Sequence, residues 1–112
     1  MKIAVTGGTG FVGRNLLQHL AATGHSLRAW YRDDKRRDSV ASQLHGVAWV
    51  RGALGSREDA RALVDGCDTL VHAALFLPGG LFRGGEGDLE AFVWANIVGS
   101  IQLFEAARDA GL

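Results

Sequence analysis

The residues with the clearest chemical potential lie near the start of the chain, in the glycine-rich segment Thr6–Gly13. This segment follows the apolar run Ile3–Val5 and precedes a stretch with helical apolar spacing. A strand that turns sharply into a helix presents unpaired backbone N–H groups and the positive end of the helix dipole, which together bind phosphate. An ordinary glycine-rich turn is the alternative, but the strand–turn–helix setting favours a phosphate site.

Three glycines of this segment have distinct expected roles. Gly7 takes the backbone angles of a sharp exit from the strand, and Gly10 lets the main chain approach a pyrophosphate closely. Gly13 lets the helix pack closely against the strand. The sequence therefore predicts a dinucleotide site with the pyrophosphate over this loop.

A second candidate group lies about 20 residues further on, where such sites recognise the adenosine ribose. An acidic residue there binds a free 2′-hydroxyl, and a basic residue binds a 2′-phosphate. The predicted strand ends at Arg32 without a carboxylate, and basic residues follow at 35–37. Because a guanidinium is a planar fork of donors that matches phosphate, the pattern favours NADP(H) and leaves NAD(H) open. A solvated charged loop is the alternative, with Asp33 and Asp34 available to the ribose.

These residues need a framework of strands and helices. Apolar runs of strand length alternate with amphipathic stretches of helix length, which is typical of βαβ units around a parallel sheet. We expect strands at Lys2–Thr6, Ser26–Tyr31, Val47–Arg51 and Thr69–Ala74. We expect helices at 11–23, 39–44, 56–66 and 89–110. The predicted fold class is α/β, the N-terminal βαβαβαβα half of a Rossmann-like, doubly wound parallel sheet.

Local patterns predict helix boundaries and faces. Ser56 with Asp59 resembles a capping box, and Asp88 is placed to cap the last helix. The first helix is predicted to turn one apolar stripe inward, formed by Phe11, Leu16, Leu17, Leu20 and Ala21. The last helix carries a stripe formed by Leu89, Phe92, Val93, Ile97, Ile101, Phe104 and Ala107. The glycine-rich loop Phe76–Asp88 is expected to be mobile without a ligand.

Ligands of open α/β sheets lie along the carboxyl edge of the strands, so further contacts are expected after the third and fourth strands. Small side chains at Ala53, Ala73 and Ala74 permit close approach of adenine and ribose, and Leu54 is placed to cover one face of the adenine. His72 precedes this edge, and we interpret it as a histidine packed within the strand rather than a ligand or a base.

Asn96 falls on the apolar stripe of the last helix, and buried amides need hydrogen-bond partners. Its side chain bonds the backbone at the strand ends, holds a ribose hydroxyl, or is a structural amide satisfied elsewhere. The sequence alone leaves these three interpretations open.

The composition favours a function that involves small molecules. Twelve Lys and Arg balance twelve Asp and Glu, so no net field draws the chain to nucleic acid or to an anionic membrane. The 112 residues form one expected domain, 1–112. No apolar run has the length of a membrane span and no secretion signal is evident, so we expect a cytoplasmic protein. Cys67 is the single cysteine, is interpreted as a small packed residue, and indicates no metal site.

Three ordered motifs resemble the extended short-chain dehydrogenase/reductase family, often described as NAD-dependent epimerases/dehydratases. They are Thr6–Gly13, Asp68–Ala74, and Asn96–Ser100 leading into Phe104–Ala107. By that resemblance the pyrophosphate lies against Gly7, Thr9, Gly10, Phe11 and Val12. The other implied contacts run from the 2′-phosphate through adenine and the middle of the cofactor to the nicotinamide ribose: Arg32 and Arg36, then Ala53 and Leu54, then Ala73 and Ala74, and last Asn96.

Two departures from the family pattern matter. The family's Asp that hydrogen-bonds the adenine amino group is Ala53 here, so that bond is lost. The family's catalytic Ser/Thr and Tyr-x-x-x-Lys lie beyond the last helix, so we assign no catalytic residue and expect the chain to end before the catalytic segment. Tyr31 and Lys35 match the spacing only by coincidence, because both belong to the adenosine end of the site.

The leading hypothesis is the NAD(P)-binding part of an oxidoreductase, epimerase or dehydratase acting on a small carbonyl or hydroxyl compound or on a nucleotide-sugar. One alternative is a redox sensor that binds NADP(H) without turnover, which the absence of a downstream Tyr-x-x-x-Lys would support. Another is a subunit-interaction fragment, since the resemblance places the helix Leu89–Ala110 in a region that pairs subunits and implies a homodimer.

Overall fold

Four parallel strands form one sheet, which in the computed structural model has the order β3-β2-β1-β4. The structure describes residues 1–77 and 88–112. The strands are β1 (Lys2–Thr6), β2 (Ser26–Tyr31), β3 (Val47–Arg51) and β4 (Thr69–His72). Val5 of β1 pairs with Ala29 on one side and with Val71 on the other, so β1 lies inside the sheet. This topology confirms the predicted Rossmann-like half-sheet.

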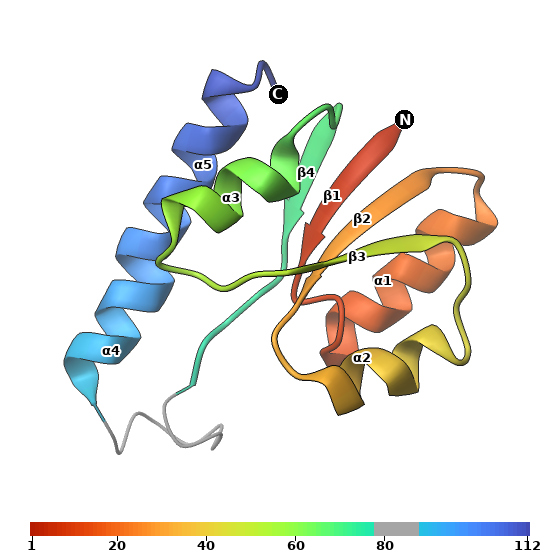
Figure 1. Cartoon of the computed structure of the whole chain (residues 1–112), viewed down its shortest axis with the longest axis horizontal. Coiled ribbons are helices and arrows are strands. Elements are labelled where there is room, and N and C mark those ends of the chain that lie inside the picture. Colours follow the sequence, from red (N-terminus) through yellow and green to blue (C-terminus); the bar gives the residue numbers. More distant parts are fainter. Residues whose placement is uncertain (78–87) are drawn as a thin grey trace.

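Helices cover both faces of the sheet. They are α1 (Phe11–Ala22), α2 (Asp34–Ala41), α3 (Arg57–Val64), α4 (Leu89–Val93), the π-helical turn η2 (Trp94–Val98) and α5 (Gly99–Asp109). α1 and α2 pack on one face, and α3 and α5 pack on the other (Figure 1). The connections β1–β2 and β2–β3 join neighbouring strands, whereas β3 connects to β4 at the opposite side of the sheet. Because all paired strands are parallel, the four strands end at the same edge.

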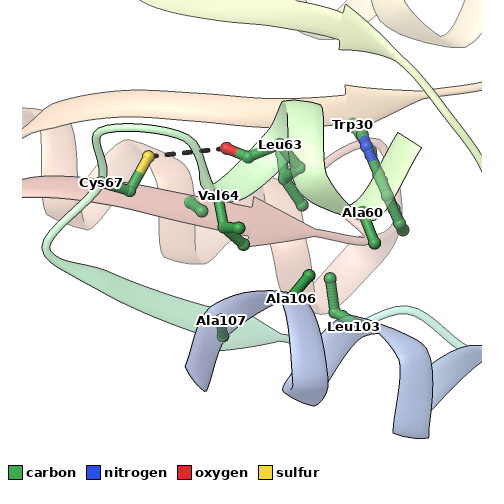
Figure 2. Packing of buried hydrophobic residues seen from close by; sticks show 9 residues of the cluster. Trp30, Ala60, Leu63, Val64, Cys67, Leu103, Ala106 and Ala107 are labelled. Atoms are coloured by element: carbon green, nitrogen blue, oxygen red, sulfur yellow. Dashed lines mark hydrogen bonds between the residues drawn. The ribbon is translucent and has the colours of Figure 1, made fainter. Parts of the chain in front are cut away.

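Alternation along β1 divides the core into two layers. Ala4 faces α3 and α5, whereas Ile3 and Val5 face α1, because successive side chains of a strand point to opposite faces. Figure 2 shows the first layer, where fully buried Leu63 and Leu103 meet between α3 and α5. The buried Cys67 thiol also lies in this layer, 3.5 Å from the Leu63 carbonyl oxygen, and burial raises its pKa.

Side-chain caps begin three of the helices. Ser56 accepts a hydrogen bond from the Asp59 N–H at 3.2 Å, and Asp88 accepts one from the Ala91 N–H at 3.1 Å, as the sequence predicts. The expected helix at 39–44 is wrong in its bounds. α2 already begins at Asp34, because the Asp33 carboxylate accepts from the first backbone N–H groups and converts the charged run into helix.

The stripe of α1 faces the core as predicted except at its first residue, whereas most of the stripe of the last helix does not. Phe11 does not face inward: its side chain is 74% exposed at the start of α1, next to the glycine loop. Along α4, η2 and α5, the large stripe residues Leu89, Val93, Ile97, Ile101 and Phe104 are exposed. Small and medium side chains face the sheet instead, because α5 packs on α3 through a different face: Ala95, Gln102, Leu103, Ala106 and Ala107.

Two expected segments end differently or fall outside the structure. β4 stops at His72 rather than Ala74, since the N–H groups of Ala73 and Ala74 turn to the Thr6 hydroxyl at 3.1 Å each. Residues 78–87 of the expected mobile loop lie outside the described residues. In the described part of the chain, no helix has the length and apolar character needed to span a bilayer.

Candidate dinucleotide-binding site

The glycine loop holds a backbone path that other residues cannot follow. Gly7 has φ +73°, and a Cβ built on it would lie 2.6 Å from the Ala73 carbonyl oxygen. A Cβ on Gly13 would collide with the Gly7 carbonyl oxygen. The fold itself therefore requires glycine at both positions, since α1 begins directly against the turn that leaves β1.

Gly10 is different, because the protein makes little demand on it. Its φ of −82° is open to any residue, and a Cβ there would meet only the Gly7 carbonyl oxygen, at 3.3 Å. Its backbone N–H donates to that same oxygen at 3.0 Å. Gly10 is exposed. A glycine that internal packing does not require leaves room for something outside the chain.

The N-terminus of α1 is open within the described part of the chain. No described group accepts from the backbone N–H of Phe11, Val12 or Gly13, and the first turn holds no acidic residue. By contrast, α2, α3 and α4 are each capped by an Asp or Ser side chain. The positive end of α1 thus presents three donors beside the exposed side chains of Phe11 and Val12.

A chain of hydrogen bonds ties the glycine loop to β4 and to the last helix. The Thr6 hydroxyl lies 2.6 Å from His72 Nδ1, and His72 Nε2 lies 2.9 Å from the Ser100 hydroxyl. Ser100 in turn donates to the Asn96 carbonyl oxygen at 2.5 Å, within the π-helical turn. Thr6 is fully buried.

The direction of this chain determines the protonation state of His72. The Asn96 carbonyl only accepts, so the Ser100 hydroxyl spends its proton there and must accept from His72 Nε2–H. His72 Nδ1 is then an acceptor for the Thr6 hydroxyl, which leaves the Thr6 oxygen free to accept from Ala73 and Ala74. Burial lowers the pKa of His72, in agreement with a neutral ring. The expected strand-packed histidine is confirmed.

The carboxylates after β2 are occupied by the protein. Asp33 accepts from the N–H groups of Lys35 and Arg36 at 2.8 and 3.1 Å, and these bonds hold the pKa of its carboxyl below the ordinary value. Asp34 binds the Arg51 guanidinium at 2.8 Å. Each acid thus has a partner within the protein, and both stay exposed.

The candidate arginines Arg32 and Arg36 are both exposed, and within the described residues neither guanidinium forms an ion pair. Tyr31, just before them, has Arg37 and Arg51 over its ring at 4.5 and 5.0 Å from the centroid. Tyr31, the last residue of β2, thus packs between an arginine of α2 and the last residue of β3.

The candidate cofactor-binding residues that follow β3 and β4 lie at the carboxyl edge of the sheet, like the glycine loop. The Ala53 N–H donates to Asp59 at 3.1 Å, so the capping carboxylate holds this loop instead of closing a full capping box. Leu54 is half-buried and packs against the α3–α5 layer, where Gly99 leaves it room. Ala73 contacts Gly7 through its backbone.

The side-chain amide of Asn96 forms hydrogen bonds with backbone groups of the protein. Its Oδ1 accepts from the Phe76 N–H at 2.8 Å, and its Nδ2 donates to the carbonyl oxygens of Phe76 at 2.7 Å and Phe92 at 3.1 Å. Both amide hydrogens are therefore used within the chain, which corresponds to the first of the three interpretations and fixes the segment after β4.

A family model matches residues 3–112 and is described as the NAD dependent epimerase/dehydratase family. The chain belongs to this family. It is 40% identical over 98% of its length to a 4-hydroxy-2-methyl-3-oxo-4-farnesyl-3,4-dihydroquinoline-1-oxide ketoreductase of Stigmatella aurantiaca, of which it covers 30%. It is 33% identical over 99% of its length to a 3 beta-hydroxysteroid dehydrogenase/Delta 5-->4-isomerase of Mycobacterium tuberculosis, of which it covers 29%.

A solved structure agrees with this family assignment. Uronate dehydrogenase from Agrobacterium tumefaciens, complexed with NAD, superposes with a TM-score of 0.71 at 26% identity, over 98% of this chain and 37% of that one. The chain thus spans about a third of the length of the relatives it matches.

Within this epimerase/dehydratase half-site, sequence reasoning missed two residues that the structure brings to the sheet edge. Ser100 continues the hydrogen-bond chain from His72. The Phe76 backbone donates its N–H to Asn96 Oδ1 and accepts from Asn96 Nδ2 through its carbonyl. Asn96 and Ser100 are four residues apart on a helix. At this spacing a serine hydroxyl commonly donates to the backbone carbonyl of the earlier residue. No comparable sequence pattern indicates the role of Phe76.

The neutral His72 predicts a pH dependence of stability. Its pKa is lower in the folded than in the unfolded chain, so the unfolded chain binds the proton more tightly. The free energy of unfolding is then complete above the ordinary histidine pKa of about 6.5 and falls as the pH drops below it. Urea unfolding from pH 8 to pH 5 should show this loss, and His72→Gln should flatten it while costing roughly 1–3 kcal/mol at pH 8. His45→Gln, at an exposed position, is the control; an equal flattening there would contradict the assignment.

Proposed function

We propose that residues 1–112 form the dinucleotide-binding part of a longer oxidoreductase of the epimerase/dehydratase family, and that the cofactor is NADP(H). The observation that carries the proposal is the open N-terminus of α1, whose first three N–H groups have no acceptor among residues 1–77 and 88–112. A pyrophosphate supplies the anionic oxygens that such a terminus lacks. Gly10 leaves the space that its approach requires.

The preference for NADP(H) is supported by the charges after β2. Recognition of an unphosphorylated ribose needs a carboxylate at this place, and Asp33 and Asp34 are held by the α2 N-terminus and by Arg51. Arg32 and Arg36 offer guanidinium donors instead. A 2′-phosphate is the group that matches them.

The substrate is proposed to be a small compound with a carbonyl or hydroxyl group. Two relatives carry names of that chemistry, a ketoreductase and a hydroxysteroid dehydrogenase. When bound, a nicotinamide cofactor supplies hydride transfer. The residues of this chain bind and orient that cofactor, with Ala73, Ala74 and the segment fixed by Asn96 proposed to line its middle and its nicotinamide ribose.

Gly10→Val tests the pyrophosphate contact. The valine side chain is compatible with the backbone at this position but fills the space above the loop, so NADPH binding should be lost in titration calorimetry of the protein in its natural length. Gly10→Ala should give an intermediate loss, and the unfolding temperature of both variants should stay within a few degrees of the original. Unchanged affinity in the folded Gly10→Val variant would overturn the site.

Arg32→Ala tests the cofactor preference. The original protein should bind NADPH more tightly than NADH, and the variant should lose on the order of tenfold in NADPH affinity with little change for NADH. Arg61→Ala, an exposed arginine on α3, should leave both affinities unchanged. Equal affinity of the original protein for the two cofactors would contradict the role of Arg32.

A second candidate function, self-association, is favoured by the exposed apolar stripe of the last helix. Val93, Ile97 and Ile101 recur at four-residue spacing and are 38%, 53% and 52% exposed. A hollow of about 630 Å³ along α4 and η2 is lined by Val93, with Leu89 and Trp94 beside it. Contiguous apolar surface of this kind marks an interface, and we propose that a second copy of the chain covers it.

Sedimentation velocity tests this pairing. The protein in its natural length should sediment as a dimer at micromolar concentration, and Ile101→Glu should shift it to a monomer without loss of helix content. Gln18→Glu, on the exposed face of α1, is the charge control. A monomeric original protein would rule out pairing through this face.

A further inference from the structure

One contact joins two parts of the site that the sequence leaves separate. The Arg32 guanidinium carbon lies 5.3 Å from the centroid of the Phe76 ring. Arg32 follows β2 and Phe76 follows β4, and β1 lies between these strands in the sheet. The contact therefore spans the end of β1, from which the glycine loop leaves. A separation below about 6 Å is that of a cation–π interaction.

Phe76 is a fixed platform for this contact. Asn96 bonds both its N–H and its carbonyl group, at 2.8 and 2.7 Å, which locks the backbone that carries the ring. The same amide is anchored to Phe92 in the preceding turn of helix. The backbone position of Phe76 is thus set by η2.

A face-on contact with the Phe76 ring would leave the hydrogen-bond donors of Arg32 free. The five donors of a guanidinium lie in its plane and point outward, whereas an aromatic ring takes only the face of that plane. Within the described residues, the Arg32 side chain makes no hydrogen bond and no ion pair. Its edge therefore stays available for a bidentate contact with a phosphate.

Three other arginines of the described residues also lie over aromatic rings, and their charge partners differ from those of Arg32. Arg37 and Arg51 both lie over the Tyr31 ring, but their guanidinium groups are bound to carboxylates of α2. Arg37 and Arg51 thus stabilise the segment between β2 and α2. Arg14 of α1 lies over the Phe11 ring at 5.6 Å and, like Arg32, has no ion pair among the described residues. Of these two arginines, Arg32 is the one that follows β2, where dinucleotide sites recognise the adenosine ribose.

We propose that Phe76 is a specificity-determining positioning residue for the cofactor: it holds the Arg32 guanidinium by its face so that the edge receives the 2′-phosphate. An exposed arginine loses rotamer freedom when it binds, and a fixed stacking partner removes part of that cost beforehand. The η2 turn thereby influences the choice between NADP(H) and NAD(H) from the far side of β1. This inference rests on the proposed function, which supplies the cofactor.

The test compares NADPH and NADH, which differ only in the 2′-phosphate, by titration calorimetry on the protein in its natural length. Phe76→Leu keeps apolar bulk and removes the aromatic face, so NADPH affinity should fall about two- to five-fold while NADH affinity stays the same. Phe92→Leu is the matched control and should change neither. In an Arg32→Ala background, Phe76→Leu should have no further effect on NADPH, because the two residues act through one contact.

Three results would overturn the proposal: no change in Phe76→Leu, an equal loss for both cofactors, or a loss that persists without Arg32. Each of these leaves the dinucleotide site itself intact. An original protein that binds neither cofactor would remove the proposed function and this inference together, and the two failures are thus distinguishable.

Discussion

The approach of Gly13 to the Gly7 carbonyl is the constraint on which the rest of the structure depends. No side chain fits at Gly13, so α1 starts directly beneath the turn that leaves β1. That placement directs the N–H groups of its first turn at the carboxyl edge of the sheet. The ends of β2, β3 and β4 reach the same edge because all four strands are parallel. A site along that edge follows from one close backbone contact.

A second set of interactions holds the far side of the site. The hydrogen bonds from Thr6 through His72 to Ser100 connect the glycine loop with the helix that follows residue 88. They end on the Asn96 carbonyl in a π-helical turn, and π-turns are frequent at functional sites. The Asn96 side chain then fixes Phe76. Loop, strand and helix are thus joined through groups whose hydrogen bonds satisfy one another.

The sequence predicted what depends on local chemistry. Apolar runs located every strand, and the capping residues Ser56 and Asp88 located two helix starts, because these patterns act within a few residues. It failed where packing partners decide. The stripe with Ile97 and Ile101 has the spacing of a buried face, but α5 packs on α3 through a different face that carries Leu103 and alanines. The Arg32–Phe76 contact joins residues that are 44 positions apart in the sequence, so no local sequence pattern predicts it.

The central claim is that the first turn of α1 receives the cofactor pyrophosphate, and amide proton shifts test it most directly. In ¹H–¹⁵N spectra recorded while NADPH is added, the amides of Phe11, Val12 and Gly13 should move downfield as they gain anionic acceptors. The Asp33-capped N–H of Lys35 already has a protein acceptor and should move less. If NADPH binds while the three α1 amides stay in place, the account of this site is wrong.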